Sequence, residues 1–259
     1  MSEDAPVVVE RPEAGIALVR IHRLARRNAL NMEVRRHLAR AFGELAEADD
    51  VRAVVLAGTE KAFAAGADLA EMADADPVDM MRRATHRLWK AVWDFEKPLV
   101  AAVRGLALGG GLELALSADV VVAAEEARLG QPEVRVGIMP GAGGIRRLLR
   151  AIGPYRTALL VMTGELVDGR TAAAWGLVSQ AVPDAEVEPR ALEIARTLAA
   201  LPPLALARIK EALRHEGDVP LEAALAFERT AFQLLFATRD QKEGMRAFLE
   251  KRQPRFEGR

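Results

Sequence analysis

Three short apolar runs in the first half of the chain constrain its fold more than any other feature. They span residues 53–57, 99–103 and 120–124, and each has the length of a buried strand rather than that of a helix. Helical patterning precedes or follows each run. Because strands that alternate with helices need crossover connections, we expect an α/β fold.

The N-terminal region predicts a hairpin followed by a capped helix. Residues 7–11 and 16–21 indicate two strands around the turn 12–15, and the second strand alternates between two faces. Asn31 can cap the helix that follows. The apolar positions with helical spacing in that helix are Val34, Leu38, Ala41, Phe42 and Leu45.

Helix-forming sequence dominates after about Asp184. The segments that suit helices are 192–201, 204–215, 221–236 and 241–252. We see no internal repeat and no low-complexity linker. We therefore expect an α/β core over residues 1–190 and a helical C-terminal part over residues 191–259.

Composition excludes several classes of function. The chain carries 36 Lys and Arg against 37 Asp and Glu, which argues against nucleic-acid binding through bulk charge. It has no cysteine, so disulfides, thiolate nucleophiles and Cys-ligated metals are excluded. The four histidines lack metal-ligand spacing, and we expect no metal. Neither a G-x-S-x-G nucleophile motif nor a P-loop occurs.

No segment has the pattern of a targeting signal or a membrane span. The N-terminus lacks a basic region and a cleavage-like site. The most apolar stretch, residues 99–124, is interrupted by Arg104, Glu113 and Asp119. We expect a cytoplasmic protein with no membrane partner.

Residues 60–72 form the first segment that could carry chemistry. Asp68 and Glu71 have capping-box spacing, which predicts the start of a helix. Residues 64–67 have almost no side chain, so their backbone N–H groups would be open to a ligand, and a helix N-terminus favours an anion. The alternative is a tight turn whose small residues only pack.

The second segment, residues 105–119, has three consecutive glycines between an expected strand and an expected helix. Such glycines let a backbone approach a ligand closely, and a helix start leaves N–H groups free. Glu113 is the only charged residue between Gly105 and Ala118. A carboxylate in such apolar surroundings is a candidate acid or base. The alternative is that Glu113 points to solvent from an amphipathic helix.

The third segment, residues 129–144, is a loop rich in Gly and Pro that leads to another glycine-led helix start before Leu148. Taken alone, Glu133 after Pro132 is typical of an exposed loop carboxylate.

Together these segments resemble the crotonase family, the enoyl-CoA hydratase/isomerase superfamily, over nearly the whole chain. The matching motifs are RNALN (27–31), KAFAAGAD (61–68), GGGLE (109–113), GQPE (130–133), PGAGG (140–144), FAT (236–238) and QKEGM (241–245). So many motifs in the right order make a chance match negligible. The resemblance implies a crotonase-like spiral of repeated β-β-α units with a helical C-terminal part at trimer contacts.

The resemblance also implies an acyl-CoA thioester as substrate and an enolate that is stabilised at its carbonyl oxygen. Carried over by motif, the backbone N–H groups of Ala67 and Gly110 would form the oxyanion hole. Both lie at expected helix starts with little side chain in the way. Such donors, held in a site that excludes water, are each worth roughly 3 kcal/mol of barrier.

Two glutamates hold one water in the hydratases of this family, and the matching residues are Glu113 and Glu133. Two carboxyls that share one apolar pocket tend to have different pKa values. We expect Glu113 to act as base toward water and Glu133 as acid toward the α carbon, with roles that interchange in the reverse direction. Because isomerases commonly keep only one such carboxylate, the pair favours hydration of trans-2-enoyl-CoA to 3-hydroxyacyl-CoA. The alternative is double-bond isomerisation or another reaction of a crotonase-fold acyl-CoA enzyme.

Coenzyme A is part of the substrate, so no separate cofactor is expected. The residues implied in substrate or coenzyme binding are Arg27, Ala29, Ala65, Asp68, Leu69, Gly141, Phe248 and Lys251. Phe248 and Lys251 match residues that reach a neighbouring subunit's coenzyme. Ala70 departs from the family, where lysine is common, so one phosphate contact is expected to be missing.

Family members form trimers that pair into hexamers, so we expect a homo-oligomer. A binding protein of this fold with an RNA-binding role is a third hypothesis, which the near-zero net charge disfavours. We expect residues 72–93 and the surroundings of Ile138 to line the acyl pocket. The sequence leaves open the acyl chain length and the pathway, fatty-acid β-oxidation among others.

Overall fold

Two β-sheets form the centre of the protein, which a computed structural model describes over residues 5–215 and 218–259. The larger sheet has the order β1 (Val7–Glu13), β2 (Gly15–Ile21), β3 (Val51–Ala57), β5 (Leu99–Val103), β7 (Val120–Ala124) and β10 (Gln180–Val182). The smaller sheet has the order β4 (Ala62–Ala64), β6 (Leu106–Leu108), β8 (Arg128–Gly130) and β9 (Leu166–Asp168). Residues 1–4, part of the segment searched for a targeting signal, lie outside the described residues.

A single pattern repeats along the chain: a strand of the larger sheet, a strand of the smaller sheet, then a helix. Strands β3 and β4 precede α2 (Pro77–Arg83) and α3 (Thr85–Trp93), β5 and β6 precede α4 (Gly110–Ala115), and β7 and β8 precede α5 (Gly144–Thr163). Equivalent strands pair in parallel. The expected α/β class with repeated β-β-α units is confirmed.

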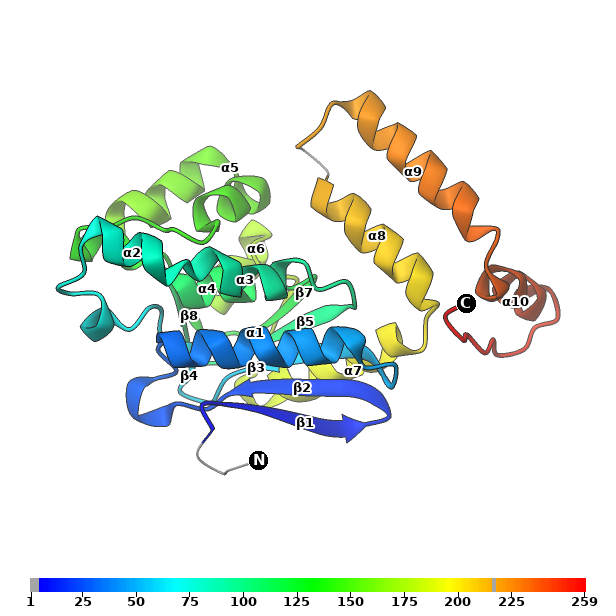
Figure 1. Ribbon diagram of the computed structural model, residues 1–259, viewed down its shortest axis with the longest axis horizontal. Helices are drawn as coiled ribbons and strands as arrows, with labels where there is room; N and C mark the ends of the chain where they lie inside the picture. The colour runs from blue at the N-terminus through cyan, green and yellow to red at the C-terminus, as the bar shows by residue number, and fades with distance from the viewer. Residues whose placement is uncertain (1–4, 216–217) are drawn as a thin grey trace.

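Helix α1 (Met32–Glu47) packs against α3 and beside β1 and β2, and it lies above β2 in Figure 1. Its cap is the expected one, because the side chain of Asn31 accepts a hydrogen bond from Val34 N at 2.9 Å. All five apolar positions expected to share a face are buried. The hairpin of β1 and β2 is also confirmed as an antiparallel pair.

The prediction that a helix begins at Asp68 is wrong. Only a 3₁₀ turn, η2 (Leu69–Glu71), stands there. Asp68 Oδ1 accepts from Ala70 N at 3.2 Å, but Glu71 Oε2 accepts from the backbone of Met32 at 3.0 Å instead of completing a capping box. The carboxylate of Glu71 therefore joins η2 to the start of α1.

The C-terminal half consists mainly of helices. After β9 its helical elements are α6 (Gly169–Trp175), η4 (Asp184–Glu186), α7 (Val187–Ala199), α8 (Pro203–His215), α9 (Leu221–Leu235) and α10 (Arg239–Leu249). Helix α7 packs on the larger sheet, and the expected division after residue 190 falls inside it. Helices α8 and α9 project from the core as a pair, with α10 beyond them (Figure 1).

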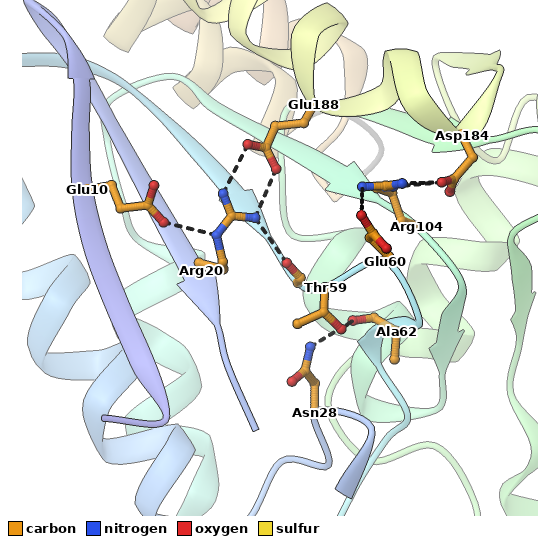
Figure 2. A network of polar contacts seen from close by, with 10 residues as sticks. Glu10, Arg20, Asn28, Thr59, Glu60, Ala62, Arg104, Asp184 and Glu188 are labelled. Carbon is orange, nitrogen blue, oxygen red and sulfur yellow. Dashed lines mark hydrogen bonds and ion pairs between the residues drawn. The ribbon is translucent and has the colours of Figure 1, made fainter. Parts of the chain in front are cut away.

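Hydrogen bonds and ion pairs connect α7 and η4, the turn before it, to residues on and next to the larger sheet (Figure 2). Arg20 on β2 donates to both carboxylate oxygens of Glu188 on α7, at 2.9 and 3.0 Å, and to Glu10 on β1 at 2.9 Å. Arg104, which follows β5, pairs with Asp184 of η4. No helix among the described residues is long and apolar enough to cross a bilayer.

Candidate active site

Two backbone amides meet where β4 ends and α4 begins. Gly110 is the first residue of α4, so its N–H has no acceptor within the helix. Ala67 lies beside Leu30 in an isolated bridge, in which Leu30 N donates to Gly66 O at 2.8 Å. A Cβ built on Gly110 would lie 3.9 Å from Ala67 N. Within the described part of the chain, neither amide donates a hydrogen bond to the protein.

Glu113 lies one turn further along α4 and points inward, with only 3% of its surface exposed. Its Oε1 accepts from Ala142 N at 2.7 Å and from Gly144 N at 2.8 Å. Its Oε2 lies 3.9 Å from the Cβ position of Gly110, on the side of the free amides. The alternative of a solvent-facing Glu113 is therefore wrong.

Glu133 comes from η3 (Pro132–Val136) and is half-buried rather than an exposed loop carboxylate. Its Oε1 lies 2.8 Å from the position that a Cβ on Gly109 would occupy. Gly109 has a φ of 51°, so glycine is needed there both for the backbone and for this approach. The buried amide of Gln131 lies beside the carboxyl, and when this amide is oriented with its nitrogen toward Glu133, the nitrogen donates to the two carboxylate oxygens at 2.9 and 3.1 Å.

The two carboxyls have different surroundings. Oε1 of Glu113 accepts hydrogen bonds from two backbone N–H groups. Burial raises the pKa of Glu133 to about 7, and the negative charge of Glu113 adds to this effect. The site thus holds two carboxyls, one of which has a raised pKa, beside two unused N–H groups, an arrangement that can protonate a carbon while stabilising a neighbouring oxyanion.

The turn from Arg27 to Ala29, expected to contact coenzyme A, lies against β4 because of Asn28. The Asn28 side chain is fully buried, and its Nδ2 donates to Ala62 O at 2.7 Å, as Figure 2 shows. The carbonyl of Arg27 accepts from Ala65 N at 3.1 Å. The structure therefore brings Arg27, Ala29 and Ala65 close to Ala67, while the side chain of Leu69 is exposed.

Asp68 binds within the chain. Its Oδ2 accepts from Arg23 at 2.6 Å, and this guanidinium lowers the pKa of the carboxyl. Gly141 is exposed with no atom within 4 Å of a Cβ position, and its neighbours Ala142 and Gly144 supply the amides that bind Glu113. Phe248 lies on α10 and Lys251 just after it, apart from α4 in Figure 1, so the chain's own glutamate pair is not near them.

Sequence reasoning assigned no role to several neighbours of the site, namely Arg35, Gln131, Ala142, Gly144 and Arg147. The small residues 140–144 before a helix carry the same signal as the three glycines, namely open N–H groups at a helix start. No local sequence pattern indicates that Arg35 and Arg147 lie near the site. Among residues 5–215 and 218–259, no group of three or more His, Cys, Asp or Glu could hold a metal.

Comparisons with known proteins agree over almost the whole chain. A family model described as Enoyl-CoA hydratase/isomerase matches residues 11–259. The protein named 2,3-dehydroadipyl-CoA hydratase from Escherichia coli K12 is 44% identical over 253 residues, which cover 98% of this chain and 99% of that one. The short-chain-enoyl-CoA hydratase from Clostridium acetobutylicum is 38% identical over 249 residues, which cover 95% of each. The structure of an enoyl-CoA hydratase from Bacillus anthracis has a TM-score of 0.93 at 35% identity and covers 98% of this chain and 100% of that one.

Proposed function

The chain belongs to the enoyl-CoA hydratase/isomerase family, and from that premise we propose that it adds water across trans-2-enoyl-CoA to give 3-hydroxyacyl-CoA. The observation that carries the proposal is the pair of carboxyls, Glu113 and Glu133, beside two unused backbone amides. An isomerase that moves a single proton has no need of the second carboxyl.

In the proposed reaction the thioester oxygen accepts hydrogen bonds from the N–H groups of Ala67 and Gly110. A water lies between the two glutamates. Glu113 takes a proton from this water as its oxygen bonds to the β carbon, and Glu133 gives its proton to the α carbon. The oxyanion that develops on the thioester is stabilised by donors that need not reorganise.

The direct test uses purified protein and crotonyl-CoA. We expect the ultraviolet absorbance of the conjugated thioester to disappear, and mass spectrometry to show a product heavier by one water. A parallel assay with a 3-enoyl-CoA separates the alternatives. Isomerisation of the 3-enoyl thioester without hydration of crotonyl-CoA would overturn the proposal in favour of the isomerase.

The pH dependence of hydration follows from the proton shared by the pair. Glu133 loses a proton as Glu113 gains one, so the pair carries one proton in both directions of the reaction. Since burial raises the pKa of Glu133 to about 7, the acid is present below that pH and lost above it. We expect kcat/KM to fall about tenfold per pH unit above about pH 7 in both directions. A profile that stays level through this range would contradict a protonated Glu133.

Two of the relatives are named for their acyl groups, one for 2,3-dehydroadipyl-CoA and one for short-chain enoyl-CoA. We propose that this chain also takes a short acyl group. For the coenzyme, the exposed Arg27 and the backbone of Ala29 and Ala65 are the proposed contacts, with Phe248 and Lys251 supplied to a neighbouring subunit.

We propose that the helices beyond α7 assemble the protein into trimers or pairs of trimers. Large apolar side chains are exposed there, namely Ile209, Leu213, Leu225, Phe232, Phe248 and Leu249. Replacing Phe232, which is 62% exposed on α9, by aspartate is expected to lower the mass measured by light scattering, because a charge cannot be buried there without a partner. Arg229→Gln on the same helix is the control. An unchanged mass for both variants would count against self-association through α9.

A further inference from the structure

Two guanidinium groups stack on two indole rings next to the proposed site. Arg35 of α1 lies 5.2 Å from the ring centre of Trp89, and Arg147 of α5 lies 5.3 Å from that of Trp93. Both tryptophans belong to α3, four residues apart, and Trp89 is buried. Stacking on an aromatic face holds a guanidinium in one plane while leaving its edge free for hydrogen bonds.

Both arginines are short of partners. Arg35 Nε donates to Leu30 O at 3.0 Å, and Arg147 Nη1 donates to Ala142 O at 2.9 Å. Among the described residues, neither guanidinium has a carboxylate within 4 Å or another hydrogen-bond acceptor. Burial lowers the pKa of both, and the charge of Glu113 opposes that shift in each case, as does Glu71 for Arg35. Two positive charges are thus partly desolvated near the carboxyl of Glu113.

Arg35 is connected to the site through Leu30. Leu30, whose carbonyl accepts from Arg35, has its Cδ1 3.7 Å from the Cβ position of Gly110. Arg35 is therefore separated from the free amides by one residue. Arg147 instead lines a cleft of about 660 Å³ behind α4, together with Arg146 and Arg150.

We infer that the free edge of Arg35 binds a carboxylate at the far end of a short acyl chain, so that the preferred substrates are 2-enoyl thioesters of dicarboxylic acids. A hydrocarbon tail would leave its N–H groups without acceptors in a partly desolvated place, which costs free energy. A carboxylate would accept two parallel hydrogen bonds from the same planar group. This inference rests on the proposed hydratase function.

The test compares trans-2-hexenoyl-CoA with trans-2-hexenedioyl-CoA, which differ only in a terminal methyl or carboxylate. We expect the wild-type protein to favour the dicarboxylic thioester by about tenfold or more in kcat/KM. Arg35→Met is expected to lower this ratio at least about tenfold, and Arg35→Lys to lower it less, because lysine keeps the charge but loses the paired hydrogen bonds. Arg36→Met, at the exposed neighbouring position of α1, is expected to leave the ratio unchanged.

Other results would overturn the inference. An equal loss on both substrates in Arg35→Met, in a variant that melts like the wild type, would show that Arg35 supports Glu113 rather than the acyl group. A wild-type preference for the methyl-ended thioester would exclude the carboxylate subsite while leaving the hydratase in place. If neither thioester were hydrated, the proposed function itself would fall.

Discussion

Replacing Glu113 by glutamine is expected to lower kcat for hydration of crotonyl-CoA by about 10³-fold. Proton transfer by a positioned carboxylate contributes 10² to 10⁴ in rate, and an amide cannot accept the proton of the water. The fold should survive, because a glutamine oxygen can still accept from Ala142 N and Gly144 N, the two contacts that hold the present carboxylate. Stopped-flow or steady-state absorbance of the conjugated thioester measures the loss.

The companion variant Glu133→Gln separates the two roles. It should also hydrate slowly, but its remaining activity should lack the decline above about pH 7, because the group that titrates there has been removed. If Glu113→Gln kept a decline that begins at lower pH, because the charge of Glu113 no longer raises the pKa of Glu133, and Glu133→Gln showed none, the assignment of the titrating acid to Glu133 would stand. Activity of Glu113→Gln within a few-fold of wild type would refute Glu113 as the base.

Sequence patterns predicted the elements whose stability is decided locally. The strand 99–103 and the helix capped by Asn31 were predicted closely, because apolar periodicity and a side-chain cap act over a few residues. The turn at Asp68 was mispredicted as a helix. There the carboxylate of Glu71 is drawn to the backbone of Met32, a partner 39 positions away that no local pattern records.

The site was predictable only in part for a similar reason. Open N–H groups at 67 and 110 follow from small residues at chain turns, and Glu113 is marked by its lone charge. Glu133 alone indicated an exposed carboxylate, yet it is half-buried because the backbone of Gly109 leaves room for it. Arg35 gave no signal, since its stacking on Trp89 depends on how α1 and α3 pack. Only the resemblance to the crotonase family, and no local pattern, predicted that Glu133 pairs with Glu113.

The three glycines at the start of α4 differ in what an added methyl group would contact, so alanine at Gly110 can test the oxyanion hole without disturbing the fold. At Gly109 the backbone has a positive φ, and at Gly111 a Cβ would lie 2.1 Å from Ala64 O, so alanine at either position should disturb the fold. At Gly110 the nearest atom to a Cβ is Leu30 Cδ1, at 3.7 Å. Gly110→Ala should therefore fold, and its melting temperature should stay close to that of the wild type.

In the folded Gly110→Ala protein the added methyl lies 3.9 Å from both Ala67 N and Glu113 Oε2, in the space proposed for the thioester oxygen. We expect kcat to fall about 10² to 10³-fold with a smaller change in KM, because the lost hydrogen bonds matter most when charge has developed on that oxygen. Gly43→Ala in α1, where no atom lies within 4 Å of a Cβ, is the matched control. It should keep full activity and gain up to about 1 kcal/mol of stability. Full activity in Gly110→Ala would show that the oxyanion does not lie between the two amides, and the mechanism would have to place the thioester elsewhere.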